Sequence, residues 1–135
     1  REEIKIKIPM MLFIIIFLAG TAGYCASNFK RANKYIAKGN KYYAKGDYLK
    51  AAAVYKKAVS SAPEYPMAHF NMAIVYTELS DIDSAIREYK KVLKLNSRDA
   101  VAYNNLGNLY AKKRNTDLAV LNYNQAIEAD PNSAL

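Results

Sequence analysis

The sequence has few of the residues that carry covalent cross-links, metal binding or catalysis. Its 135 residues include one cysteine, one histidine and no tryptophan. The lone Cys25 cannot form an internal disulfide, and no cysteine and histidine cluster with metal-ligand spacing is present. Glycine-rich phosphate loops are also missing, and His69 is the only histidine available to a nucleophilic triad. The sequence therefore predicts no enzyme, no cofactor and no metal site.

Proline and glycine are also scarce, with four and five residues, and 52% of the chain is hydrophobic. This composition is typical of one folded domain with a modest core. The net charge of +8 is concentrated, because residues 27–65 carry nine basic and two acidic side chains while the segments after them are balanced. Within that segment, lysines recur every three or four residues, at Lys30, Lys34, Lys38, Lys41 and Lys45. On a helix they form one stripe, which is either a solvated face or a surface for an acidic partner.

An uncharged segment precedes the lysines, from Ile8 to Phe29. Its most apolar part, residues 8–19, is followed by small residues, and this order favours a secretory signal peptide. A single membrane anchor over residues 8–27 is the alternative, with the lysines that follow it held in the cytoplasm, and a buried soluble helix is a third. We assign residues 1–29 to a signal peptide or membrane anchor, and expect an exported protein, periplasmic or extracellular, or else a single-pass membrane-anchored one. Lipidation of Cys25 is disfavoured because no small residue directly precedes it.

The remainder of the chain is an internal repeat with a period of 34 residues. Copies at residues 32–65, 66–99 and 100–133 align without a gap. Small or aromatic residues recur at fixed positions of each copy. They are Gly39, Ala73 and Gly107 at position 8, Tyr42, Tyr76 and Tyr110 at position 11, Ala51, Ala85 and Ala119 at position 20, and Tyr55, Tyr89 and Tyr123 at position 24. This pattern resembles the tetratricopeptide repeat (TPR) family, and the resemblance covers nearly everything after residue 31.

The repeat predicts an all-α fold, a TPR solenoid that follows an N-terminal hydrophobic helix. Apolar residues follow a helical period within each copy, and turn-forming residues interrupt the period midway. Each copy is therefore a helix–turn–helix unit, and the stacked units form an α-α superhelix. The TPR domain is assigned to residues 30–135, and the expected helices cover about 30–45, 48–61, 66–79, 82–95, 100–113 and 116–129.

The repeats supply an internal control for the lysine stripe. Positions 3, 7, 10 and 14 are apolar in the second copy but are lysine in the first, at Lys34, Lys38, Lys41 and Lys45. In a solenoid this face packs on the preceding repeat, and the first copy has none, so the simplest interpretation is a polar N-terminal cap. A retained membrane segment would add contact with anionic lipid. Binding of nucleic acid is not expected, because no base-stacking platform or known motif accompanies the charge.

The opposite end of the repeat array is apolar. Val120 and Ile127 align with Ile86 and Leu93, which should pack on the next repeat. We therefore expect the natural protein to continue beyond residue 135, or this end to pair with another chain, possible self-association included. His69 occupies a core position and is expected to be a packing residue.

The resemblance also implies a binding groove. In the family, a concave groove is lined by positions 2, 5, 6, 9, 12 and 13 of each first helix. The candidate groove residues are Ile36, Asn40, Tyr43, Met67, Phe70, Asn71, Ile74, Val101, Asn104, Asn105, Asn108 and Lys112, with Asn33 and Thr77 beside them. Asparagine amides both donate and accept, which suits the backbone of an extended peptide, and Met67, Phe70 and Ile74 are the expected apolar anchor.

One family variant clamps the C-terminal carboxylate of chaperones. Asn40 and Asn71 match its asparagine positions, but its basic positions hold Ile36, Val101 and Asn105. The chain is therefore not expected to bind chaperone tails. The predicted function is a non-catalytic protein–protein interaction adaptor that binds a protein or peptide in the groove. The alternative is a structural assembly module that makes its contacts through the ends of the solenoid.

Overall fold

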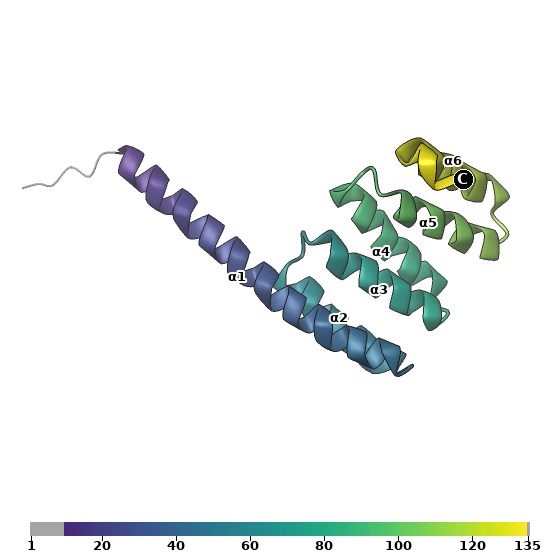
Figure 1. Ribbon diagram of the computed structural model, residues 1–135, viewed down its shortest axis with the longest axis horizontal. Helices are drawn as coiled ribbons and strands as arrows, with labels where there is room; N and C mark the ends of the chain where they lie inside the picture. The colour runs from purple at the N-terminus through teal and green to yellow at the C-terminus, as the bar shows by residue number, and fades with distance from the viewer. Residues whose placement is uncertain (1–9, 135) are drawn as a thin grey trace, which may run out of the picture.

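The computed structural model describes the backbone of residues 10–134 and the side chains of residue 23 and residues 25–132. This part of the chain is all-helical and contains three helix pairs (Figure 1). The helices are α1 (Met10–Ala44), α2 (Tyr48–Ser61), α3 (Pro66–Glu78), α4 (Ile82–Leu95), α5 (Ala100–Lys112) and α6 (Thr116–Ala129), followed by the short 3-10 helix η1 (Pro131–Ala134). The predicted TPR solenoid is confirmed, with each 34-residue copy forming one helix pair.

Side-chain caps explain where most of these helices begin. Asp47, Asp81, Asp99 and Asn115 each accept a hydrogen bond from the backbone N–H three residues later. Such a cap satisfies one of the donors that the first helical turn leaves unpaired. The helix α3 instead opens with Pro66, whose missing N–H removes one of those donors. Local sequence therefore sets the starts of the five helices α2 to α6.

The turns inside the three repeats share one backbone conformation. Gly46 has a φ of 74°, and the residues at the matching positions, Ser80 and Arg114, have φ values of 60° and 58°. This left-handed region is readily adopted by glycine and costs other residues about 1 kcal/mol or more. The second and third repeats thus keep the turn geometry of the first without its glycine.

The first helix begins earlier than expected. The sequence predicts a start near residue 30, but α1 runs without a break from Met10 and extends beyond the helix pairs (Figure 1). No proline occurs between Met10 and Ala44, and isolated glycines such as Gly23 are tolerated inside a helix. No helix in the part described with side chains is long and apolar enough to cross a membrane. The apolar run at residues 8–19, which carries the predicted signal or anchor, lies outside that part.

The two helices of a repeat approach closely at small residues. Ala51, Ala85 and Ala119 are buried at the start of the second helix of each pair. Gly39 and Gly107 have no Cβ, which leaves room for the rings of Tyr55 and Tyr123. A Cβ at either position would lie closer to the ring than the ordinary van der Waals distance. In the first and third repeats, glycine at position 8 therefore makes room for the tyrosine ring at position 24.

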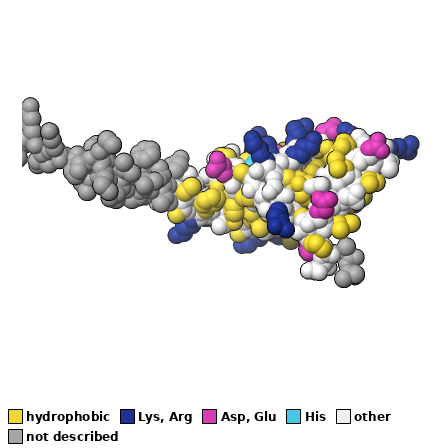
Figure 2. Space-filling view, turned by 90° about the horizontal axis from the view of Figure 1, so that it is seen from above, with side chains coloured by type: hydrophobic (Ala, Val, Ile, Leu, Met, Phe, Trp, Pro, Cys, Tyr) yellow, Lys and Arg dark blue, Asp and Glu magenta, His cyan; other side chains and the backbone are white. Residues whose placement is uncertain are grey.

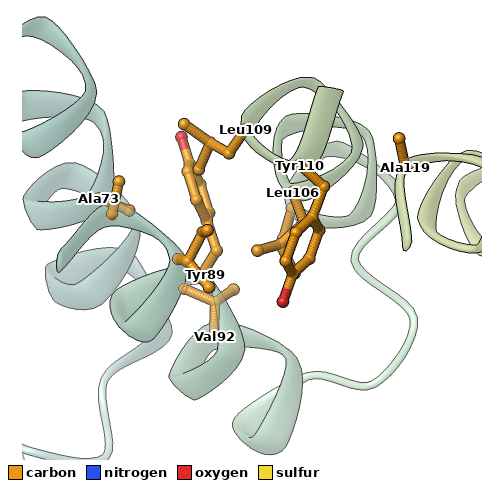
Figure 3. Close-up of a cluster of buried hydrophobic side chains, with 10 residues drawn as sticks. Ala73, Tyr89, Val92, Leu106, Leu109, Tyr110 and Ala119 are labelled. Atoms are coloured by element: carbon orange, nitrogen blue, oxygen red, sulfur yellow. The ribbon is translucent and has the colours of Figure 1, made fainter. Parts of the chain in front are cut away.

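Contacts between repeats build the core. Tyr89 and Val92 of α4 face Leu106 and Leu109 of α5, and this cluster is the largest of three (Figure 3). Each helix packs mainly on its neighbours in sequence, and the one further contact of note joins α1 to α3. The domain is thus a linear stack, with one open face at each end.

Candidate functional site

In the first and third repeats, a tyrosine of the second helix donates a hydrogen bond to an asparagine of the first helix. The Tyr55 hydroxyl donates to Asn40 Oδ1 at 2.7 Å, and the Tyr123 hydroxyl donates to Asn108 Oδ1 at 2.7 Å. Both asparagines are at position 9, and both tyrosines are at position 24 of the same repeat. Because each Oδ1 accepts from tyrosine, the exposed Asn40 and Asn108 keep their Nδ2 donors for a ligand.

The middle repeat departs from this pattern. Position 9 is Ile74, which has no acceptor, and position 8 is Ala73. Tyr89 instead accepts a hydrogen bond at 3.0 Å from Nδ2 of Asn105 in the next repeat. Burial raises the pKa of Tyr89 to about 12, so this phenol stays neutral at physiological pH. The Tyr89–Asn105 contact therefore links the second repeat to the third beneath the groove.

An apolar hollow lies between the beginnings of α3 and α5. Its lining includes Met67, Phe70 and Val101, together with Tyr65 and Val92. Its volume is about 380 Å³. Met67 and Val101 are 50% and 59% exposed, while the Phe70 ring packs edge-on against Tyr89 at 5.5 Å between ring centres. The structure thus brings together three residues that the resemblance assigned to the groove from two different repeats.

A second hollow lies next to Tyr89, toward the C-terminal ends of α3 and α5, and Leu109 and Ala111 form part of its wall. It is here called the polar hollow after its amide and ammonium groups. It is lined by Asn105, Asn108 and Lys112 of α5 and by Thr77 of α3, with Tyr89 between them. One basic group and two amides at this place offer donors to the carbonyl oxygens or carboxylate of a peptide. The apolar and polar hollows both border α3 and α5, so one extended segment lying across these helices would contact both.

Other candidate groove residues are buried in the core, bonded within their own helix or placed at a different hollow. Ile36 is 8% exposed and packs with Ala32 and Ala58, so it supports the first repeat rather than lining the groove. Ile74 is half-buried against the central core and does not line the apolar hollow. Asn71 Nδ2 donates to the carbonyl of Met67 in its own helix at 3.0 Å. Asn104 is exposed but lines a different hollow, which is next to α6.

Two tyrosine hydroxyls form hydrogen bonds that join α1 to the two ends of α3. The Tyr43 hydroxyl donates to Glu78 Oε1 at 3.1 Å, and burial together with this carboxylate raises the pKa of Tyr43. The Tyr65 hydroxyl donates to Asn33 Oδ1 at 2.9 Å. Tyr65 was not among the predicted groove residues, because it is the last residue of the first copy and lies outside the helices that line the groove. Its only sequence signal is an aromatic residue directly before Pro66.

The single histidine is a buried packing residue, as predicted. His69 Nδ1 lies 2.6 Å from Glu88 Oε2, and its Nε2 lies 2.8 Å from the carbonyl oxygen of Pro63. Both partners are acceptors, so both ring nitrogens donate and the imidazole carries a positive charge. The Glu88 hydrogen bond raises the pKa of His69. Burial raises the pKa of Glu88, but its hydrogen bonds with His69 and Lys91 outweigh that effect and lower it.

The two ends of the stack have opposite character. Lys34, Lys38, Lys41 and Lys45, here called the lysine face, are all exposed, which agrees with an N-terminal cap. At the other end Val120 and Ile127 are about half exposed, whereas Ile86, which matches Val120 in the second repeat, is buried against the third repeat. Apolar side chains also stand among charged ones over the face of the domain shown in Figure 2.

Comparison with protein families matches residues 39–133, which are most of the repeat region. A model described as TPR repeat matches residues 39–80 and 75–113, and a second, described as tetratricopeptide repeat, matches residues 100–133. The chain belongs to the tetratricopeptide repeat family. A comparison with curated proteins finds no match.

Solved TPR structures superpose well on the domain. The first TPR of Spaghetti (RPAP3), bound to the HSP90 peptide SRMEEVD, is 27% identical with a TM-score of 0.74, over 77% of this chain and 82% of that one. The Sgt2 TPR domain from Aspergillus fumigatus is 26% identical with a TM-score of 0.71, over 75% and 67%. MamA is 24% identical with a TM-score of 0.73, over 76% and 60%, and this likeness concerns the fold alone. Members of this family are generally protein-binding modules without catalysis, and one of the similar structures is bound to a peptide.

Proposed function

We propose that this TPR domain is a non-catalytic adaptor that binds an extended segment of a partner protein across α3 and α5. The observation that carries the proposal is the pairing of the apolar hollow with the polar hollow on the same two helices. An apolar side chain of the ligand would enter between Met67, Phe70 and Val101. Its backbone would meet the amides of Asn105 and Asn108 and the ammonium of Lys112. The likeness to a TPR bound to a peptide supports this mode of binding.

Substitutions at exposed positions of the apolar hollow test the proposal. Met67→Glu combined with Val101→Glu places two carboxylates where the ligand side chain would lie, and neither residue is buried in the core. Leu49→Glu with Leu121→Glu is the matched control, because both leucines are exposed and lie on second helices. Selection from a library of random peptides displayed on phage should enrich sequences with a recurrent apolar residue. The groove variant should lose them while the control keeps them, and equal retention by both variants would refute the assigned site.

The chaperone tail itself is expected to be a poor ligand. The positions that carry basic residues in the clamp are filled by Ile36, Val101 and Asn105, and the first of these is buried. Without those cations the carboxylates of SRMEEVD lose charge-assisted hydrogen bonds, which are worth roughly twice as much as neutral ones. Titration by calorimetry should show SRMEEVD binding more weakly than library-selected peptides. Tight binding of SRMEEVD would mean that other residues form the clamp.

Assembly through the end of the solenoid is the second candidate function. It is favoured by Val120 and Ile127, which lie on one face of α6 and are each about half exposed. Replacement of Val120 and Ile127 by glutamate should abolish any concentration-dependent self-association in sedimentation equilibrium and leave peptide capture intact. A chain that is monomeric at all concentrations, with or without the substitutions, would exclude assembly of identical chains.

Location depends on residues 8–27. We propose that this segment directs export or anchors the chain in a membrane, on the basis of its uncharged apolar sequence. The N-terminus of the protein isolated from its native source decides between the two. A start near residue 23 or 27 supports a cleaved signal peptide, and retention in a membrane fraction supports an anchor. A full-length chain in the soluble fraction contradicts both.

A further inference from the structure

The lysine face occupies a surface that holds a helix in the other two repeats. At the matching positions of α3, Ala68, Met72 and Val75 are buried under α2. At those of α5, Ala102, Leu106 and Leu109 are buried under α4. The shape of this surface on the first helix of a repeat is therefore suited to a facing helix. On α1 the same surface is open, and its side chains are lysines.

No carboxylate of residues 25–132 forms an ion pair with the lysine face. Among the residues described with side chains, the ion pairs formed by lysine join Lys50 to Asp47, Lys91 to Glu88 and Lys113 to Asp83. None of them involves Lys34, Lys38, Lys41 or Lys45. These four lysines, with Tyr35, Ala37 and Tyr42, line a hollow of about 730 Å³ on the outside of α1. The first repeat thus presents a concave, uncompensated positive surface apart from the groove.

A second copy of the chain fits this surface poorly. The Lys113–Asp83 pair shows which positions meet when one repeat follows another, and by that register Lys45 would lie opposite Asp117 of a second copy. The middle of the interface would be mismatched, because Lys38 and Lys41 take the places of the buried Leu106 and Leu109. They would face the apolar side of α6, where burying an unpaired ammonium is costly.

We propose that the lysine face docks an acidic helix of a partner protein, in the place that α2 takes on α3 and α4 takes on α5. From Lys34 to Lys45 the face spans about 16 Å, at 1.5 Å per residue, which is three turns of a facing helix. Glutamate or aspartate at every third or fourth position of that helix would meet the ammonium groups, while the lysine stems cover its apolar atoms. A helix in that place would contact Tyr42 and the lysine stems as well as the ammonium groups, whereas a flat bilayer would meet mainly the ammonium groups.

The experiment uses the full chain and a defined probe. The probe is a fluorescent peptide of about 15 residues, helical and alanine-based, with glutamates along one face, and its partner peptide has glutamine at those positions. Fluorescence anisotropy should show that the chain binds the glutamate peptide and does not bind the glutamine peptide. Lys38→Glu with Lys41→Glu should weaken it by about tenfold or more, since two favourable charges become repulsive. Lys56→Glu with Lys57→Glu is the control, because these exposed lysines lie on α2 and make the same change in net charge.

A charge exchange makes the result specific to docking. The Lys38→Glu, Lys41→Glu variant should bind a peptide that carries lysine in place of glutamate, and the unaltered chain should not. The proposal is overturned if both double variants weaken binding equally, because the attraction is then diffuse, or if the glutamate peptide does not bind at all. It is also overturned if vesicles with about 30% anionic lipid, or duplex DNA, bind through Lys38 and Lys41 in place of the peptide. Self-association that is lost in the same variant would instead identify a second copy as the occupant.

Discussion

Replacing Gly107 with alanine tests how tightly the third repeat is packed. A Cβ at this position would lie 2.5 Å from Cε1 and 2.6 Å from Cδ1 of Tyr123, where ordinary contacts are 3.4–4 Å. The ring must therefore retreat by about 1 Å, the difference between these distances. Its hydroxyl bonds Asn108 at 2.7 Å, and a displacement of that size would break or weaken this hydrogen bond. The substitution should thus affect both the packing of α5 on α6 and the orientation of a groove amide.

The expected cost follows from three terms of known size. Overpacking costs about 1–3 kcal/mol, and loss of a hydrogen bond costs about 0.5–1.5 kcal/mol. Alanine recovers about 0.5–1 kcal/mol over glycine inside a helix. The net loss is about 0.5–4 kcal/mol by these three estimates. Tyr89 beside Ala73 shows the alternative arrangement, in which the hydroxyl bonds Asn105 of the next repeat.

Urea unfolding followed by circular dichroism measures this effect. Gly107→Ala should lower the unfolding midpoint, while Gly23→Ala should leave it unchanged or raise it, because no atom lies within 4 Å of a Cβ at Gly23. Trimming the ring with Tyr123→Leu should remove most of the cost of Gly107→Ala, a non-additivity expected of residues in contact. The reasoning fails if Gly107→Ala is as stable as Gly23→Ala, or if its cost is unchanged in the Tyr123→Leu background.

Three further predictions concern stability. The pKa of His69 is raised in the folded state, so its contribution to stability is fully present below its ordinary value of 6.5 and is lost as the pH rises through the folded value. The pKa of Glu88 is lowered, so its contribution is fully present above its ordinary value of 4.5 and is lost as the pH falls through the folded value. Thermal melting should therefore peak between these values, and His69→Gln should remove the decline on the basic side; an unchanged profile would contradict the charged pair. Leu106→Ala should cost about 2–5 kcal/mol in urea unfolding, while Leu121→Ala, at a half-exposed site, should cost almost nothing, and similar losses would refute the assigned core. Asp99→Ala should remove the cap of α5 and cost about 1 kcal/mol, whereas Asp99→Asn should cost much less.

The period of 34 residues was enough to predict the helix pairs. The observed bounds of α2, α4 and α6 agree with the expected ones, because aspartate or asparagine caps begin each of these helices. The start of α1 could not be predicted this way, because Ser27 and Asn28, which are residue types that often cap a helix, lie inside α1. Periodicity locates the repeat but does not say how far a helix continues outside it.

The site was less predictable than the fold, because it depends on side-chain conformations. The position of Ile36 in the repeat predicts that it lines the groove. The structure instead packs Ile36 against small neighbours such as Ala58, and it is buried in the core. Similarly, the size of one residue, Ala73 in place of glycine, accompanies a different hydrogen-bond partner for Tyr89. Met67 and Val101 come from different repeats and line the same hollow. This arrangement depends on how α3 and α5 stack, which the sequence of one copy does not specify.

The linear stacking of the helices has a consequence for folding kinetics. Because nearly all contacts join elements adjacent in sequence, the chain closes only short loops as it folds, and domains with such low contact order fold in microseconds to milliseconds. Folding can begin in any helix pair and spread to the next. The middle pair, α3 with α4, has neighbours on both sides, so its amide hydrogens should exchange most slowly with solvent. A pulling force on either end would then unravel the chain one repeat at a time.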